Sequence, residues 1–183
     1  MVDTTPEFDV DDAIVLMLGA DPGPRERQGE VRGITRLEKL VFLLEKETDA
    51  AKLMTEDPDF EAYNFGPFSR KVYQAIDMLS AAGLVEDSAE LSRTNDDQIE
   101  ASRVIGQDAV SPYSTRDFRL TELGREYYEA LSQELPRSVF DQAARLRQRF
   151  AGWSLRDLIS YVYRNYDSYT ENSLIRDDIL GER

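Results

Sequence analysis

Apolar residues recur at helical spacing in several segments of the chain, and short stretches rich in glycine, proline or charge separate these segments. The first segment, residues 9–20, begins with acidic residues that suit a helix N-terminus, and it predicts a helix. Its apolar residues lie three or four positions apart: Val10, Ile14, Met17 and Leu18. Residues 19–33, which contain Pro22-Gly23-Pro24 and mixed charge, predict a loop.

A second helix is expected from Thr35. Thr35-Arg36-Leu37-Glu38 has the sequence of a capping box, in which the side chains of the first and fourth residues satisfy each other's backbone N–H groups. The apolar positions that follow form one stripe: Leu37, Leu40, Val41 and Leu44. Residues 48–60 are polar, and Asp57-Pro58-Asp59 within them predicts a turn.

A third helix is expected to begin after Ser69, which can accept a hydrogen bond from a backbone N–H of the first turn. Gly66-Pro67 disfavours an earlier start, because the residue before a proline avoids the helical region. Phe68 and Tyr73 occupy the positions of a hydrophobic staple. The buried face is expected to hold Val72, Ala75, Ile76, Leu79 and Ala82.

This third helix is expected to stop at Gly83, and Leu84-Val85 to begin a strand. Residues 117–120 supply the antiparallel partner of that strand. The intervening segment, 86–117, is polar and acidic through residue 100, and it is long for a hairpin tip. We therefore expect an elaborated wing there.

Three further helices are expected in the last third of the chain. Thr121 caps the first, and Pro136 ends it. The second begins at a capping box over residues 138–141, and Gly152 ends it. Ser154-Leu155-Arg156-Asp157 begins the third, after which come a tyrosine-rich segment and a short final helix.

This order of elements predicts a mainly α protein with a small β-hairpin, formed by a winged-helix-like domain and additional C-terminal helices. Residues 1–33 are expected to form an acidic N-terminal helix and loop. Residues 34–135 then form the winged-helix-like core, and residues 136–183 form a helical extension packed on it. A chain of 183 residues is long enough to hold all three parts in a single domain.

Composition adds one strong bias, the excess of acidic residues. The 36 acidic residues outnumber the 22 basic ones, which gives a net charge of −14, and the only lysines are Lys39, Lys46, Lys52 and Lys71. This composition resembles that of cytosolic proteins from salt-loving archaea, in which negative charge preserves solubility in concentrated salt. The alternative is an ordinary acidic bacterial protein. No apolar run is long enough to span a bilayer and no secretory signal is visible, so we expect a cytoplasmic protein.

Two stretches resemble a known family. Residues 37–42, Leu-Glu-Lys-Leu-Val-Phe, are followed by an aromatic-rich turn over 60–67, by Tyr73 and by Gly83-Leu84-Val85. This combination resembles the Panacea or SocA-like antitoxin superfamily and related prokaryotic proteins, over residues 34–86 and more loosely over 118–175. The resemblance implies a winged-helix-like domain that acts by binding, in toxin neutralisation, phage defence or transcriptional regulation. The long acidic wing and the absence of histidine depart from that pattern.

If the third helix reads DNA, its outward face offers Arg70, Lys71 and Gln74, and Ser69 would add a contact to the DNA backbone. Arginine and glutamine can read guanine and adenine edges, and the helix N-terminus favours phosphate. The alternative is a solvated helix face, and Asp77 in its middle counts against DNA.

The wing weakens the DNA interpretation, because its acids would repel a nucleic-acid backbone at short range. It favours instead a protein partner, or a wing that folds away from the binding face. A single Arg93 opposes its acidic residues: Glu86, Asp87, Glu90, Asp96, Asp97 and Glu100.

An excess of arginine marks the C-terminal helices. A phosphate or an acidic partner could bind there, and pairing of these arginines across a helical interface is the alternative. The candidates are Arg145, Arg147, Arg149 and Arg156. The tyrosines of the same region, Tyr161, Tyr163, Tyr166 and Tyr169, are expected to lie in the core or in a homodimer contact.

Signals for catalysis are poor. Without histidine and cysteine the chain has no imidazole base, no thiol nucleophile and no His/Cys zinc site, and phosphate-loop and dinucleotide fingerprints are absent. The sequence thus predicts a non-catalytic regulator without cofactor or metal, which binds DNA as a homodimer. The alternative is a protein-interaction module, antitoxin-like or adaptor-like, that binds a partner protein without DNA.

Overall fold

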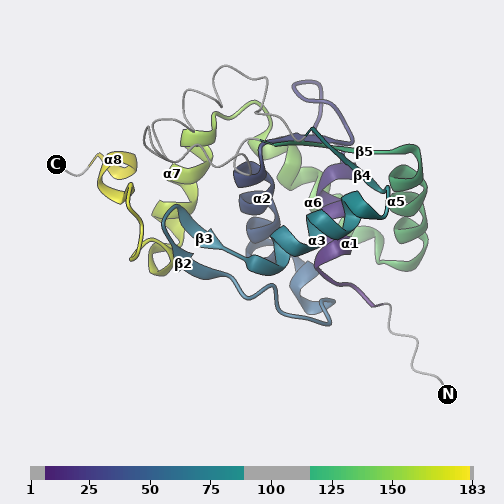
Figure 1. The fold of residues 1–183 in the computed structure, drawn as a ribbon, viewed down its shortest axis with the longest axis horizontal. Helices are drawn as coiled ribbons and strands as arrows, with labels where there is room; N and C mark the ends of the chain where they lie inside the picture. Colours follow the sequence, from purple (N-terminus) through teal and green to yellow (C-terminus); the bar gives the residue numbers. More distant parts are fainter. Residues whose placement is uncertain (1–6, 89–115, 182–183) are drawn as a thin grey trace.

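The computed structural model describes residues 7–88 and 116–181, which form a mainly helical protein with two small antiparallel sheets. This confirms the prediction of a mainly α protein with a small antiparallel β component. Along the longest axis, α5 lies at one end and α7 and α8 lie at the other, with α1, α2 and α3 between them (Figure 1). The predicted wing falls mostly on residues outside the described part of the chain.

The first helix, α1 (Val10–Gly19), is the central helix of the core. Asp9 caps it, because the Asp9 carboxylate accepts from the Asp12 amide and the Asp12 carboxylate accepts from the Asp9 amide. Nearly every residue of α1 is buried, and α2, α3, α5 and α6 all pack against it. The acidic N-terminal segment therefore supplies the centre of the fold as well as its start.

A three-stranded antiparallel sheet joins β1 (Glu30–Arg32), β5 (Asp117–Leu120) and β4 (Val85–Asp87), in that order. The predicted pairing of the strand at Val85 with residues 117–120 is confirmed, with Val85 opposite Leu120. The loop prediction for residues 19–33 is wrong at its end, where β1 pairs with β5 and places Val31 opposite Phe118. Both of these apolar residues are buried, so β1 covers part of the core.

The second helix, α2 (Ile34–Glu47), begins one residue before the predicted cap. The capping box at Thr35 is wrong, because Gly33 occupies the cap position and no side chain caps the helix. Thr48 caps the short 3₁₀ helix Asp49–Lys52 that follows. Beyond the turn, β2 (Glu61–Tyr63) and β3 (Gly66–Phe68) form a hairpin that the sequence analysis described only as a turn.

The start of α3 (Arg70–Ala81) confirms the predicted local chemistry. The Ser69 hydroxyl accepts from the Val72 amide at 3.2 Å, and the rings of Phe68 and Tyr73 lie 5.2 Å apart. Gly83, with a φ of 77°, ends the segment. The buried face holds Val72, Ala75, Ile76 and Leu79, and only Ala82 of the expected set is exposed.

The C-terminal helices are α5 (Glu122–Glu134), α6 (Arg137–Phe150), α7 (Leu155–Asn165) and, after the 3₁₀ helix Asp167–Tyr169, α8 (Arg176–Leu180). The caps Thr121 and Ser154 are confirmed, since their hydroxyls accept from the amides of Gly124 and Asp157. The box at Ser138 is wrong, because α6 already begins at Arg137, directly after Pro136.

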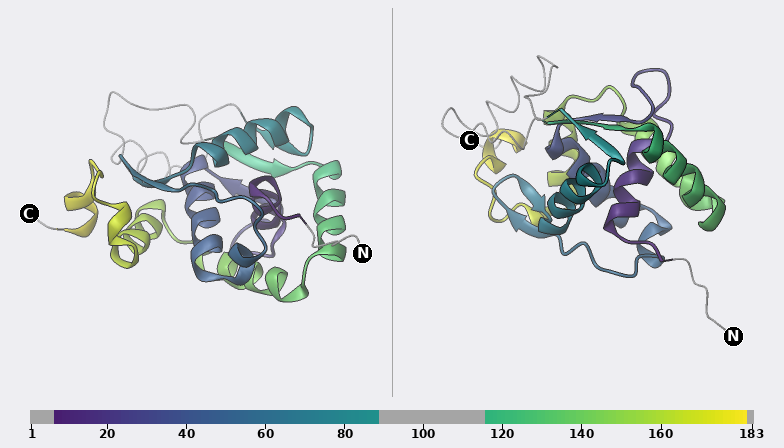
Figure 2. Two further views of the ribbon diagram at one scale, coloured as in Figure 1. Left: turned by 90° about the horizontal axis from the view of Figure 1, so that it is seen from below. Right: turned by 45° about the vertical axis from the view of Figure 1, so that its right-hand side comes forward.

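The buried apolar residues of all these helices form one continuous core. In Figure 2 the C-terminal segment lies against the β2–β3 hairpin, so parts of the chain about 100 residues apart come together. Across residues 7–88 and 116–181, no helix has the length and apolar character needed to cross a membrane.

Candidate functional site

Ser69 lies inside the protein and is not part of a surface. Its side chain is fully buried, and its hydroxyl donates to the Pro58 carbonyl at 2.5 Å while accepting from the Val72 amide. Its own amide donates to the Glu38 carboxylate at 3.0 Å. The expected contact between Ser69 and a DNA backbone is therefore corrected to a structural role.

Lys71 is on the predicted face, but acidic residues surround its charge. Its ammonium lies 2.7 Å from the Glu56 carboxylate and 2.6 Å from that of Asp59, and it donates to the Asp57 carbonyl. These carboxylates raise the pKa of Lys71 and compete with any phosphate. Arg70 and Gln74 remain exposed, four positions apart on one side of α3.

Asp77, the acidic residue on the same face, has a cationic partner. The Arg116 guanidinium lies 3.3 Å from the Asp77 carboxylate and 3.1 Å from that of Asp87, and it stacks over the ring of Phe118 at 5.5 Å. Arg116 thus ties α3 to the strands β4 and β5. This pair reduces the negative charge that α3 presents.

Two neighbouring charges of α2 are buried beneath the start of α3. Lys39 donates to the Glu38 carboxylate at 3.1 Å and to the Pro67 carbonyl at 2.7 Å, while the second Glu38 oxygen accepts from the Ser69 amide. Burial raises the pKa of Glu38, and the Lys39 ammonium opposes that shift. We call Glu38, Lys39, Pro67 and Ser69 the buried junction, because they fix the turn before α3 to α2.

The C-terminal segment closes over the same turn. Gly66 has a φ of 89°, and a Cβ there would come 2.7 Å from the ring of Tyr163. The Tyr163 hydroxyl hydrogen bonds to Ser173 at 2.8 Å, and the Leu174 amide donates to the Asn64 carbonyl at 3.0 Å. The C-terminal segment thus meets the turn over 60–67 and α2, which carry the family resemblance, at one place.

The four C-terminal arginines do not form one patch. Arg147 is buried and pairs with Glu26 at 3.0 Å, on the side of α6 opposite to Arg145 and Arg149. Arg149 pairs with Glu47 at 3.2 Å, and Arg156 of α7 pairs with Asp178 at 3.1 Å. Three of the four predicted patch residues are thus in separate intramolecular pairs, and the fourth, Arg145, is exposed on α6.

The tyrosines of the C-terminal segment pack into this same chain. Tyr163 is buried, and the rings of Tyr166 and Tyr169 lie edge-on to Phe42 at 5.0 Å each. Tyr161 packs on Phe150, also at 5.0 Å. The core interpretation of these side chains is confirmed.

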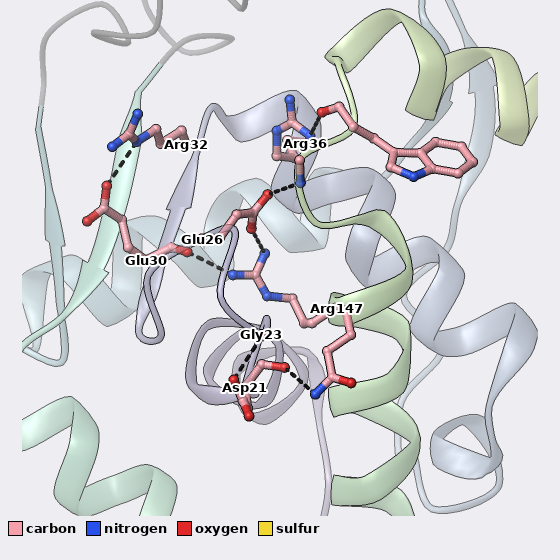
Figure 3. Close-up of polar contacts among 10 residues, drawn as sticks. Asp21, Gly23, Glu26, Glu30, Arg32, Arg36 and Arg147 are labelled. Atoms are coloured by element: carbon pink, nitrogen blue, oxygen red, sulfur yellow. Dashed lines mark hydrogen bonds and ion pairs between the residues drawn. The ribbon is translucent and has the colours of Figure 1, made fainter.

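A cavity of about 490 Å³ opens where the loop before β1 meets the α6–α7 turn. Four arginines line it together with two glutamates, Gly152, Trp153 and Ser154. We call it the arginine cavity. Figure 3 shows Arg32 and Arg36 on one side of it and Glu26 and Glu30 between them and Arg147. The arginines of its lining are Arg25, Arg27, Arg32 and Arg36.

The base of the arginine cavity is held by charge-assisted hydrogen bonds. Arg36 is 7% exposed and donates to the Trp153 carbonyl at 2.9 Å. Glu26 joins the two sides, because its carboxylate pairs with Arg147 and accepts from the Gly152 amide at 3.1 Å (Figure 3). Burial lowers the pKa of Arg147, Glu26 opposes the shift, and the nearby Arg36 adds to it.

Sequence reasoning missed this cavity, because its arginines are in a segment described as a loop and in the first turn of a helix. The signal present in the sequence was the density of arginine itself: Arg25, Arg27, Arg32 and Arg36 fall within 12 residues of an acidic chain. Among the described residues, no group of carboxylates with metal-binding geometry occurs.

Comparisons with protein-family models, with curated proteins and with solved structures found no match to this chain. The resemblance to the SocA-like antitoxins stays a prediction.

Proposed function

We propose that this protein is a non-catalytic winged-helix regulator that binds DNA through α3. The supporting observation is topological: α1, β1, α2, α3, β4 and β5 occur in this order, with the β2–β3 hairpin inserted between α2 and α3, and β1 pairs with β5 to give the order β1-β5-β4. Winged-helix proteins that bind DNA place the helix before the hairpin in the major groove. In this chain that helix is α3.

The outward side of α3 is exposed, as a reading helix requires. Arg70 and Gln74 near its N-terminus have no acidic partner among the described residues, and they are the side-chain types that read guanine and adenine. Asp77 is paired with Arg116, so it opposes a phosphate less than a free carboxylate would. The binding contribution would come from these two side chains and not from Lys71 or Ser69.

The chain departs from a compact helix-turn-helix in one respect. Residues 48–69, with a 3₁₀ helix and the β2–β3 hairpin, separate α2 from α3 where helix-turn-helix proteins use a turn of three or four residues. The buried junction compensates for this long connection, because Lys39 and Glu38 of α2 hold the start of α3 against α2. The presentation of α3 therefore depends on this junction.

A second candidate function is a protein-interaction module, and the side chain of Met78 favours it. Met78 is 63% exposed on α3, and flexible, polarisable methionines are common on protein-binding surfaces. The carboxylates of Glu56 and Asp59 next to Lys71 favour a protein partner in the same way. In this function α3 would contact a partner protein and no DNA.

The DNA proposal is tested by selecting binding sequences from a random duplex library in molar and in low potassium chloride. We expect enrichment of a site whose affinity falls about tenfold or more in Arg70→Ala/Gln74→Ala, since each base contact contributes ~1–3 kcal/mol. The matched control is Arg125→Ala/Gln133→Ala, the same exposed residue types on α5. Failure to enrich any sequence, or equal affinity of both double variants, contradicts the proposal.

The protein-interaction candidate predicts a stoichiometric partner that copurifies with the wild type and is lost in Met78→Lys. Leu123→Lys is the control, because Leu123 is 52% exposed and lies on α5. A partner retained by both variants would move the contact away from α3. Sedimentation velocity of the purified protein tests the separate prediction of a homodimer.

A further inference from the structure

The arginine cavity holds more positive charge than its own residues use. Four arginines, Arg25, Arg27 and Arg32 of its lining and Arg147 at its base, surround two glutamates, Glu26 and Glu30. In a chain with a net charge of −14, this is a local reversal of sign. Such a concentration of like charge around a hollow lowers the free energy of a bound anion.

Both glutamates are already engaged by protein groups. The Glu26 carboxylate pairs with Arg147 on one oxygen and accepts from the Gly152 amide on the other. The Glu30 carboxylate pairs with Arg32 at 3.1 Å, and the Glu30 carbonyl accepts from Arg147 at 3.0 Å. Neither carboxylate pairs with Arg25 or Arg27.

Two arginines of the lining have guanidinium N–H groups from which no protein group among the described residues accepts a hydrogen bond. Arg25 and Arg27 are exposed at the rim, and within residues 7–88 and 116–181 neither side chain forms a hydrogen bond or an ion pair. Arg32 uses only its Nε on Glu30, and its side chain is 48% exposed. A guanidinium carries five N–H donors in a planar fork that matches the oxygens of a phosphate group.

The backbone adds to the positive electrostatic potential of the arginine cavity. Ser154, which caps α7, lines the cavity, so the N-terminus of an 11-residue helix is directed at its edge. The positive end of a helix dipole favours an anion. Gly152 also lines the cavity, with a φ of 76° that a side-chain residue would rarely adopt.

We propose that the arginine cavity binds a small organic phosphate, a ligand with at least two negative charges on phosphoryl oxygens. Its volume of about 490 Å³ lies within the range of small-molecule sites. Arg25, Arg27 and Arg32 contact the phosphoryl oxygens, while Arg147 supplies positive charge from the base. This site is separate from α3, so it stands whether or not α3 binds DNA.

The position of the cavity gives the ligand a route to α3. Glu30 and Arg32 belong to β1, and β1 pairs with β5. Arg32 is opposite Asp117, next to Arg116, which pairs with Asp77 of α3. A ligand on Arg32 thus acts on the strand that adjoins the Arg116–Asp77 pair.

The experiment is isothermal titration calorimetry of the full chain with potassium pyrophosphate at constant potassium concentration and ionic strength. We expect saturable 1:1 binding with a dissociation constant below about 1 mM. Arg25→Gln/Arg27→Gln should weaken it about tenfold or more, because two charge-assisted hydrogen bonds are lost. Both residues are exposed, so the double variant is expected to fold.

The matched control is Arg125→Gln/Arg145→Gln, which removes the same charge at exposed positions outside the cavity. Pyrophosphate affinity in that variant should equal that of the wild type. An equal loss in both variants would reduce the effect to net charge and overturn the site. No saturable binding by the wild type overturns it too, and citrate binding as tightly as pyrophosphate overturns the phosphate class.

Discussion

The buried junction and the arginine cavity contain similar charges in opposite situations. In the junction, Lys39 and Glu38 are nearly inaccessible, and the structure provides each with a partner at 3.1 Å or less. In the cavity, Arg25 and Arg27 face solvent and have no partner among the described residues. Burial of a charge requires its neutralisation within the protein, whereas a charge at a hollow can be neutralised by a ligand.

The largest effect is expected from Lys39→Met in the buried junction. It leaves Glu38 buried without its cation, and breaking a buried pair in this way costs about 3–5 kcal/mol. Urea denaturation measures the loss. Glu38→Gln/Lys39→Met should be less destabilising than the single change, and Lys52→Met, an exposed lysine, should leave the midpoint nearly unchanged. If the double variant were less stable to urea than Lys39→Met, the destabilisation would not come from leaving Glu38 without its cation.

The next effect is expected from Gly66→Ala, which introduces a Cβ 2.7 Å from the Tyr163 ring at a φ of 89°. Positive φ alone costs about 1–2 kcal/mol for a residue with a side chain. Gly83→Ala isolates that part, because Gly83 has a φ of 77° and no atom within 4 Å of the added Cβ. Thermal unfolding should show a larger decrease in melting temperature for Gly66→Ala than for Gly83→Ala. Equal decreases would show that the Tyr163 ring moves aside without destabilising the protein.

A third region, the start of α1, tests a set of like charges without a cation. Burial, together with Asp9, Asp12 and Glu56, raises the pKa of Asp11 from 3.8 to about 6. Because the folded-state pKa is the higher one, Asp11 adds to stability at low pH, and this contribution is lost as pH rises from 3.8 through about 6.

Asp11→Asn has no carboxyl group to ionise at this position. Its free energy of unfolding, relative to that of the wild type, should therefore increase as pH rises across this window. Urea denaturation at several pH values measures the difference, and Asp141→Asn, an exposed aspartate of α6, is the matched control. A difference between Asp11→Asn and wild type that does not change with pH would refute the shift.

The smallest effect on stability is expected from Arg25→Gln/Arg27→Gln at the arginine cavity. Exposed side chains without partners usually change the free energy of unfolding by no more than about 0.5 kcal/mol. Urea denaturation without phosphate measures this. A loss comparable to that of Lys39→Met would mean that these arginines stabilise the fold, and would remove the contrast between the two regions.

Local signals in the sequence were sufficient for some of these elements. Ser69 and Gly83 mark the start and the end of α3 as expected, because a capping residue and a glycine with positive φ act within a few residues. The strand 117–120 was also predictable from its pattern. By contrast, β1, β2 and β3 have three residues each, so their own sequences carry little signal, and β1 also depends on a partner far away in the chain.

The candidate site was less predictable than the fold. Glu38 has the sequence position of a capping-box residue, but the structure directs it into the core, where the Ser69 amide and Lys39 bind it. Ser69 was expected on the surface because a capping hydroxyl and a surface hydroxyl give the same sequence signal. In the sequence, Arg147 lies among other arginines and was grouped with them. Only the fold shows that it is buried, where it pairs with Glu26 and donates to the Glu30 carbonyl.

The aromatic cluster around Phe42 has a consequence for the synthesis of the protein. Phe42 contacts Phe60 and also Tyr166 and Tyr169, whose rings arrive more than 120 residues later. A nascent chain therefore cannot complete this part of its interior until residue 169 has left the ribosome, and until then Phe42 and Phe60 are without their final neighbours. Folding on the ribosome must proceed with this side of α2 open, where a chaperone can bind.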